Sequence, residues 1–393
     1  MPLSNIIRVL LREVKLVATD HSLLLTLLIA PLLYAFFYGS IYSYKLEEKV
    51  PLSVVDDDRS ALSRQLVEQI GLTQMVQITY VPDLQTAQEN IKAGVSQGLL
   101  YIEKGMERKV MSMQQAHMVV ALNAARFLPS SDLLAAITRV GLTVGAGVRL
   151  KYSQMGGLNN EMAMQETQPV ILDYRPLFNE QASYGAFLLP GLLALILQQT
   201  LLIGISGGAA AERGRGTFNG LMQSAGYNIS AALWGKGLFY LVLFCCYAFF
   251  FTQVNFNILH IDMRGSGWQL AVVMLLFLLT LIPMGLFIGW MFRSQLLCTQ
   301  IMAFSTYPFF LVTGYTWPLE KLPPALKAFS ALLPTTPFLE LYQGIVQQGA
   351  DISDRAPALV HLAILWLSYT LICLWKMKRL TVISDKAVTF GPG

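Results

Sequence analysis

The chain has 393 residues, of which 54% are apolar and only 13% charged, and its formal net charge is +4. This balance excludes an ordinary soluble domain and favours a protein whose main solvent is the lipid bilayer. The small positive charge requires no nucleic acid partner, because basic residues normally collect at the cytoplasmic ends of membrane spans.

The first segment of the chain is amphipathic. From Leu3 to Val17 apolar residues recur at helical spacing, with basic residues between them. Such a helix can lie in the membrane interface. We therefore expect residues 1–21 to form a cytoplasmic elbow helix, the alternative being a continuous cytoplasmic extension of the first span.

Six later segments are apolar and long enough to cross the hydrocarbon core, which takes roughly 20 helical residues. The first of them is too long for the core of a secretion signal, contains Pro31, and has no small-residue cleavage site after it. A short polar turn, Arg293-Ser294-Gln295, separates the fourth from the fifth. The predicted spans are residues 22–44, 185–207, 229–254, 268–292, 296–313 and 358–376.

Basic residues near the span ends predict the orientation of the chain. They place both termini in the cytoplasm. The expected location of the protein is the inner membrane of a bacterial cell. Lys236 and Arg293 lie near span ends, where long side chains can reach the interface, so we expect no charge in the middle of any span. The basic residues on the cytoplasmic side are Arg8, Arg12, Lys15, Arg213, Arg215, Arg293, Lys376, Lys378 and Arg379.

Residues 45–183 form a long polar insert between the first two spans, and we expect an extracytoplasmic α/β domain there. Short β-branched runs predict strands at Leu52–Val55, Val76–Val81 and Gly98–Ile102. Ser60 and Asp83 are suitable caps for helices that run to about Ile70 and Ala93.

The rest of the insert, from Val119 to Met155, has a helical pattern that we expect to break near Pro129. Its apolar section is not expected to be a seventh span. Arg139 and Arg149 argue against one, because a central charge on a lipid-facing helix costs at least about 2.5 kcal/mol.

The chain lacks the motifs of several enzyme classes. The ATP-binding pattern G-x-x-x-x-G-K-[S/T] is absent, and Gly235-Lys236-Gly237 is the nearest fragment. H-E-x-x-H and G-x-S-x-G are absent too, and the histidines are scattered. The cysteines Cys245, Cys246, Cys298 and Cys373 all lie in predicted spans, so neither disulfides nor a metal site are expected. We therefore assign no catalytic, cofactor-binding or metal residues.

A charged turn and a short apolar helix lie between the second and third spans, within residues 208–228. An ordinary cytoplasmic loop accounts for the arginines but not for the apolar side of the helix. A docking surface for a soluble partner accounts for both. The candidate docking residues are Glu212, Arg213, Arg215, Gly216, Thr217, Phe218 and Leu221.

Five prolines interrupt the apolar pattern between Val312 and Phe338. Irregular backbone at membrane depth must be buried in protein or face water. Two interpretations remain: a plain outer loop, or an outer re-entrant hairpin over residues 314–340 that gates a pathway. The candidate gate residues are Gly314, Pro318, Pro323, Leu326, Phe329, Leu333, Pro334 and Pro337. The tail, residues 380–393, is short and polar and has no readable role.

Four stretches resemble the permease subunits of ABC-2 type exporters. The run from Glu212 to Thr217 is similar to the E-R-G-T element after the second span, and Asp56 to Ser63 resembles the run D-x-D-x-S-x-x-S that opens a long first loop. Asn179 to Gly191 is similar to the entry N-x-x-x-x-Y-x-x-F-x-x-P-G to the second span. The proline-rich stretch from Gly314 to Pro337 resembles the outer hairpin. The resemblance covers nearly the whole chain.

The resemblance implies a polytopic α-helical membrane protein with six transmembrane helices and an α/β extracytoplasmic domain between the first and second. It implies separate ABC ATPase subunits that bind ATP and Mg and dock on a coupling helix at residues 208–228. It also implies a second permease copy, identical or a paralogue, beside the five-helix region 184–379. A periplasmic adaptor is a further candidate partner of the outer domain.

The missing charges in the spans suggest an amphipathic substrate, such as a drug, a lipid or a lipid-linked compound. They disfavour an ion-coupled carrier, which needs ionisable groups at membrane depth. The alternative function is a membrane-anchored receptor or scaffold whose outer domain binds a ligand, although the cytoplasmic segments are short for signalling. A membrane enzyme is the least favoured class.

Overall fold

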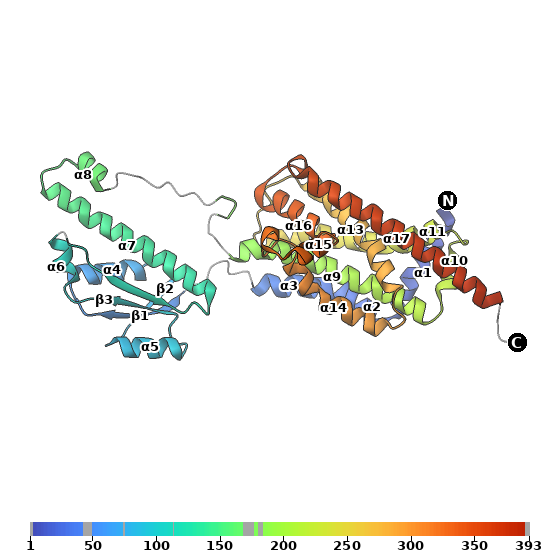
Figure 1. Ribbon diagram of the computed structural model, residues 1–393, viewed down its shortest axis with the longest axis horizontal. Coiled ribbons are helices and arrows are strands. Elements are labelled where there is room, and N and C mark those ends of the chain that lie inside the picture. The colour runs from blue at the N-terminus through green and yellow to red at the C-terminus, as the bar shows by residue number, and fades with distance from the viewer. Residues whose placement is uncertain are drawn as a thin grey trace. The chain divides into compact units, whose positions relative to one another are not determined.

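The computed structural model describes residues 3–41, 49–73, 75–112, 114–167, 177–179 and 184–389 (Figure 1). The chain divides into two compact units. One, the helical unit, combines Met1–Ser43 with Leu177–Gly393, and the other, the α/β unit, is Tyr44–Pro176.

The helical unit contains long helices joined by short ones. Its elements are α1 (Leu3–Thr19), α2 (His21–Leu24), η1 (Leu25–Ile29), α3 (Ala30–Ile41), α9 (Tyr184–Gly214), α10 (Phe218–Ser224), α11 (Ile229–Phe249), η2 (Phe250–Asn255), α12 (Phe256–Ile258), α13 (Gly267–Gly289), α14 (Gln295–Leu311), η3 (Leu319–Lys321), α15 (Pro324–Ser330), α16 (Thr335–Gln343), η4 (Gly344–Gln348), η5 (Ile352–Arg355) and α17 (Ala356–Thr389).

Six described helices are long and apolar enough to cross a membrane, so the chain is a polytopic helical membrane protein. Five overlap predicted spans: His21–Ile41, Tyr184–Gly214, Ile229–Ile258, Gly267–Gly289 and Ile352–Val382. The predicted span 296–313 corresponds to α14, whose 17 residues fall just short of that length and which packs on α9. The predicted end of the first span, residues 42–44, lies outside the described residues.

The sixth long apolar helix is α7 (Phe127–Met155), which belongs to the α/β unit. Leu133 and Ile137 on one side of α7 are buried in the core of that unit. Arg139 and Arg149 are exposed on it. The apolar length of α7 therefore serves to cover the sheet, in agreement with the predicted helix of the insert.

The elbow is a separate helix. α1 ends at Thr19, and Asp20 then leaves helical geometry with φ −102° and ψ 101°. The Asp20 carboxylate accepts hydrogen bonds from the backbone N–H groups of Ser22 and Leu23 and so caps α2. The alternative of one continuous helix into the first span is therefore wrong.

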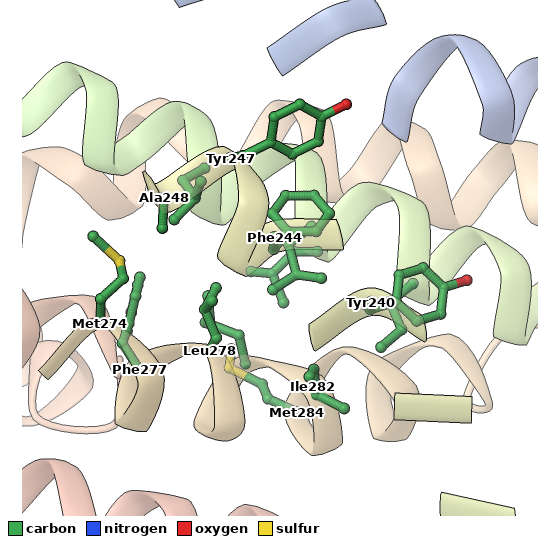
Figure 2. Close-up of a cluster of buried hydrophobic side chains, with 14 of the residues drawn as sticks. Tyr240, Phe244, Tyr247, Ala248, Met274, Phe277, Leu278, Ile282 and Met284 are labelled. Atoms are coloured by element: carbon green, nitrogen blue, oxygen red, sulfur yellow. The ribbon is translucent and has the colours of Figure 1, made fainter. Parts of the chain in front are cut away.

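Part of the core of the helical unit lies between α11 and α13 (Figure 2), and the same core includes residues of α9, α16 and α17. Phe244 of α11 points toward Leu278 of α13, whereas Tyr247 points the other way and its hydroxyl donates to the Leu28 carbonyl. All three side chains are buried. Lipid tails are as apolar as these side chains, so close packing rather than removal from water stabilises this contact.

The α/β unit contains a four-stranded sheet in the order β2-β1-β3-β4. The first three are parallel and β4 is antiparallel to β3. Helix α5 lies on one face of the sheet, and α4 and α7 lie on the other (Figure 1). The elements are β1 (Val50–Asp56), α4 (Ala61–Gly71), β2 (Val76–Tyr80), α5 (Leu84–Lys92), β3 (Gly98–Ile102), α6 (Met106–Met111), β4 (Met118–Leu122), α7 and α8 (Asn160–Thr167).

The three predicted strands and the two capped helices of the insert are present. Val119, however, lies in β4 and not in a helix, and α6 was not predicted. Pro129 does not break α7, because it lies in the first turn, where a helix has no N–H bond for proline to remove.

The aspartates after β1 anchor the turns around it. Asp56 accepts a hydrogen bond from the Ser63 hydroxyl at 2.8 Å, and Asp58 accepts from the backbone N–H groups of Gly105 at 2.6 Å and Glu107 at 2.9 Å. Burial alone raises the pKa of Asp58, but these hydrogen bonds and one from Ser60 bring that pKa below its ordinary value of 3.8. The run D-x-D-x-S-x-x-S thus has a structural role here.

We predict that Asp58→Ala destabilises α6 by about 1–2 kcal/mol, because two backbone N–H groups lose their acceptor. Hydrogen exchange of the full chain should show faster exchange at residues 105–111. Because the pKa of Asp58 is lowered in the folded state, its stabilisation of α6 is present above about pH 4. In the wild type, protection of α6 from exchange should therefore be lost as the pH falls further. Asp57→Asn is the control, because among the described residues the Asp57 carboxylate accepts from the Tyr101 hydroxyl and from no backbone N–H of α6. Equal exchange in the two variants would contradict the prediction.

Candidate functional site

The charged turn at Glu212 lies at the end of α9, which extends beyond the predicted residue 207 to Gly214. Glu212 is in the last turn, and its side chain is only 2% exposed. Arg12 of α1 donates a hydrogen bond from Nη1 to Glu212 Oε1 at 2.6 Å and one from Nη2 to the Thr217 carbonyl at 3.2 Å. The elbow helix is thus joined to the segment expected to couple to an ATPase.

A second ion pair lies beside the first. Lys236 of α11 donates to both carboxylate oxygens of Glu13, at 2.7 and 2.6 Å, and its Nζ lies 3.5 Å from Glu212 Oε2. The Tyr240 hydroxyl donates to Glu13 Oε1 at 2.8 Å. We call Arg12, Glu13, Glu212, Lys236 and Tyr240 the buried ion cluster.

The buried ion cluster is electrically balanced, with two carboxylates, one ammonium and one guanidinium. Glu13, Lys236 and Tyr240 are at most 1% exposed. A lone buried charge costs several kcal/mol, and direct pairing with added hydrogen bonds offsets much of that cost. Each charge in the cluster therefore depends on its partners, and so does the contact between α1, α9 and α11.

Close backbone packing brings α1 into this position. A Cβ on Gly235 of α11 would lie only 2.7 Å from the Cβ of Val9, so a larger residue would push α1 away. Asn5 of α1 donates from Nδ2 to the Ala225 carbonyl at 3.1 Å, where α10 ends. The elbow helix thus contacts both α10 and α11 along its length.

A second contact joins the start of the first span to the same turn. Asp20, besides capping α2, lies 3.4 Å from the guanidinium of Arg215 and accepts a hydrogen bond from Gln295 at 3.2 Å. Arg213 donates to the Trp290 carbonyl at 2.6 Å, and the Phe218 and Trp290 rings meet edge to face at 5.7 Å. The α9–α10 turn is therefore held to the ends of α1 and α13.

The structure divides the predicted coupling residues into two groups. Arg215, Gly216 and Thr217 are exposed, and Arg213 is half-buried. Glu212 points into the buried ion cluster, and Phe218 and Leu221 are buried in the core of the helical unit. The apolar side of α10 is therefore explained by packing within the chain, so it does not require a docked partner.

The predicted gate residues also divide by exposure. Leu333, Pro334 and Pro337 are buried where α16 packs on α13 and α17. Pro318, Pro323, Leu326 and Phe329 are exposed, and Gly314 adopts φ +89° at the start of the hairpin. The Phe329 ring meets Phe309 of α14 edge to face at 5.4 Å.

Sequence reasoning missed most of the buried ion cluster. Lys236 was expected to reach the interface, but it is buried and paired eight residues into α11. Glu13 offered a signal, because it is an acid among basic residues and lies on the same helix face as Val9 and Val17. Glu13 on the buried face of the elbow helix and Lys236 inside an apolar run have opposite charges, so each could supply the partner that the other needs.

We predict that Lys236→Met lowers the free energy of unfolding by about 3–5 kcal/mol, because Glu13 loses its counter-ion in a buried site. Thermal unfolding of the purified full chain measures the change. The double variant Glu13→Gln/Lys236→Met removes both charges and keeps an acceptor for Tyr240, so it should be more stable than Lys236→Met alone. A double variant as unstable as the single would show that pairing is not what holds the cluster.

Comparisons with known proteins agree with this architecture. The family model described as "ABC-2 family transporter protein" matches residues 21–375. The inner membrane transport permease YhhJ of Escherichia coli K12 is 24% identical, over 96% of this chain and 98% of its own length. The linearmycin resistance permease protein LnrN of Bacillus subtilis 168 is 24% identical, over 87% of this chain and 91% of its own length. The probable multidrug ABC transporter permease YbhS of E. coli K12 is 23% identical, over 86% of this chain and 87% of its own length. The chain belongs to the ABC-2 family of transporter permeases.

Proposed function

We propose that this chain is the permease subunit of an ATP-driven exporter and works with separate ATPase subunits. The observation that carries the proposal is the buried ion cluster, which makes the elbow helix, the α9–α10 turn and α11 one mechanical unit. A force applied at the turn reaches three helices at once, as coupling requires.

The ATPase would contact the exposed side of the turn. Arg215, Gly216 and Thr217 are exposed there, together with Gln223 and Tyr227 at the end of α10. The ATPase would bind ATP and Mg, since this sequence lacks G-x-x-x-x-G-K-[S/T]. Closure of two ATPase subunits would push on this surface and tilt α9 and α11.

The α/β unit and the hairpin would lie on the opposite side of the membrane from the turn. The supporting observation is the distribution of basic residues, which favours cytoplasmic termini. The exposed hairpin residues Leu326 and Phe329 would then gate the outer mouth of a pathway between two permease copies, identical or paralogous.

The substrate would be amphipathic. Lys236 is paired within the chain, and Lys376, Lys378 and Arg379 lie near the end of the span Ile352–Val382, so the middles of the described spans of the helical unit hold no free charge for an ion. One relative is named for linearmycin resistance and another for multidrug transport, which favours an organic compound, a drug, lipid or lipid-linked molecule.

We predict that Arg215→Glu lowers the ATPase activity of the complex at least fivefold, because it reverses an exposed charge at the proposed contact. The purified complex with the candidate ATPase gives the activity, and co-purification gives the binding. Lys92→Glu is the matched control, since Lys92 is in α5 of the α/β unit. Wild-type activity and binding in Arg215→Glu would remove the docking claim.

The topology has its own test. Cysteine at Lys92 should react with a membrane-impermeant maleimide in intact spheroplasts, whereas cysteine at Gln223 should react only after lysis. The native cysteines are first replaced by serine or alanine. Labelling of both positions from the same side would contradict the proposed orientation.

A further inference from the structure

A group of basic side chains lies beside the end of α9 and the last apolar turns of α17. Lys376 of α17 is half-buried, and the charged groups that act on it are Arg213 of α9 and Arg379 of α17, both positive. Among the described residues, no carboxylate pairs with any of these three side chains. We call them the basic corner. Like charges repel one another, so an anion would stabilise this corner.

Basic residues at the neighbouring α9–α10 turn are paired, in contrast to the basic corner. Arg12 and Lys236 belong to the buried ion cluster, where carboxylates pair with both, and Arg215 lies 3.4 Å from Asp20. Arg213 donates to a backbone carbonyl, which has no net charge and leaves the guanidinium unneutralised. The counter-charge of the basic corner is therefore not supplied by the described part of the chain.

The guanidinium of Arg379 is held by an aromatic ring. Its central carbon lies over the Trp375 ring, 4.0 Å from the centroid. A guanidinium over a ring face keeps the N–H donors at its edge available to another group. These donors form a planar fork that matches the oxygens of a phosphate. Arg379 is exposed, so a phosphate can reach it.

An exposed apolar stripe of α17 leads to Arg379. Ile364, Leu367, Leu371 and Trp375 recur at helical spacing and share one face, and each is at least half exposed. Arg379 follows Trp375 by one turn on the same face. At 1.5 Å per residue the stripe is about 16 Å long, about half of a hydrocarbon core of about 30 Å. Its length thus matches one leaflet, and tryptophan is typical of the headgroup level where the stripe ends.

We propose that the basic corner binds the phosphate of an acidic phospholipid such as phosphatidylglycerol, whose acyl chains lie along the apolar stripe of α17. Arg379 would donate to the phosphate oxygens, and Lys376 and Arg213 would add positive charge beside it. A zwitterionic lipid fits less well, because its ammonium group would lie near three cations with no carboxylate paired to them. This inference concerns lipid binding and does not rest on the proposed exporter function.

The test measures lipid binding to the full chain without ATP or any ATPase. The purified chain in detergent is titrated with phosphatidylglycerol or with phosphatidylethanolamine of the same acyl chains, and native mass spectrometry counts the bound lipids. We expect the first phosphatidylglycerol to bind about tenfold more tightly than phosphatidylethanolamine, and Lys376→Gln/Arg379→Gln to abolish this preference. Arg379→Gln alone changes an exposed side chain and should reduce the preference several-fold.

The matched control removes the same number of charges elsewhere. Lys321→Gln/Lys327→Gln changes two exposed lysines, in η3 and α15, and should bind phosphatidylglycerol as the wild type does. Equal weakening in the two double variants would show only a general attraction between charges and would overturn the proposal. Wild-type preference in Lys376→Gln/Arg379→Gln would overturn it as well.

Two further arms test what occupies the basic corner. Dihexanoyl phosphatidylglycerol, whose chains are too short to cover the stripe, should bind more weakly than the long-chain lipid. Equal affinity, or displacement of the lipid by excess inorganic phosphate, would assign the corner to a soluble anion.

A protein contact is the remaining alternative for the basic corner. If Lys376→Gln/Arg379→Gln keeps its phosphatidylglycerol preference but no longer co-purifies with the ATPase, the corner binds protein and the lipid proposal fails. If phosphatidylglycerol binds as expected but the complex exports nothing from vesicles, the exporter proposal fails and the lipid site stands.

Discussion

The buried pairing of Lys236 with Glu13 is the constraint on which the contact between α1, the α9–α10 turn and α11 depends. Neither charge is stable alone in that environment, so α1 must lie where its carboxylate reaches the ammonium. Arg12 and Glu212 add a second pair next to the first. These pairs fix the position of α1 relative to α9 and α11 more specifically than apolar contacts alone would, because each charge must meet its partner.

This constraint gives the α9–α10 turn its proposed role. The turn is anchored through Arg12, through Asp20 and through Trp290, and its tip at residues 214–217 is exposed. A flexible loop would deform when a partner pressed on it, whereas an anchored turn would pass the force on to the helices that it contacts.

Much of the fold follows from sequence because its signals are local. Hydrophobic length predicts the spans, and caps such as Ser60 and Asp83 predict helix starts in the α/β unit. The strand at Met118–Leu122 was missed because its residues suit a helix as well, and its pairing with β3 decides the outcome. The ion cluster was missed for a related reason: Glu13 and Lys236 are 223 residues apart, and only the fold brings them together.

The most direct test of the account is a distance measurement in the complex with its ATPase. Spin labels at Lys15 and Gln223 report on the elbow and the turn, and a pair at Gln223 and Leu326 reports on the span between the turn and the hairpin. The account predicts that ATP leaves the first distance unchanged and alters the second. A change in the Lys15–Gln223 distance with a constant Gln223–Leu326 distance would contradict the claim that elbow and turn move as one body.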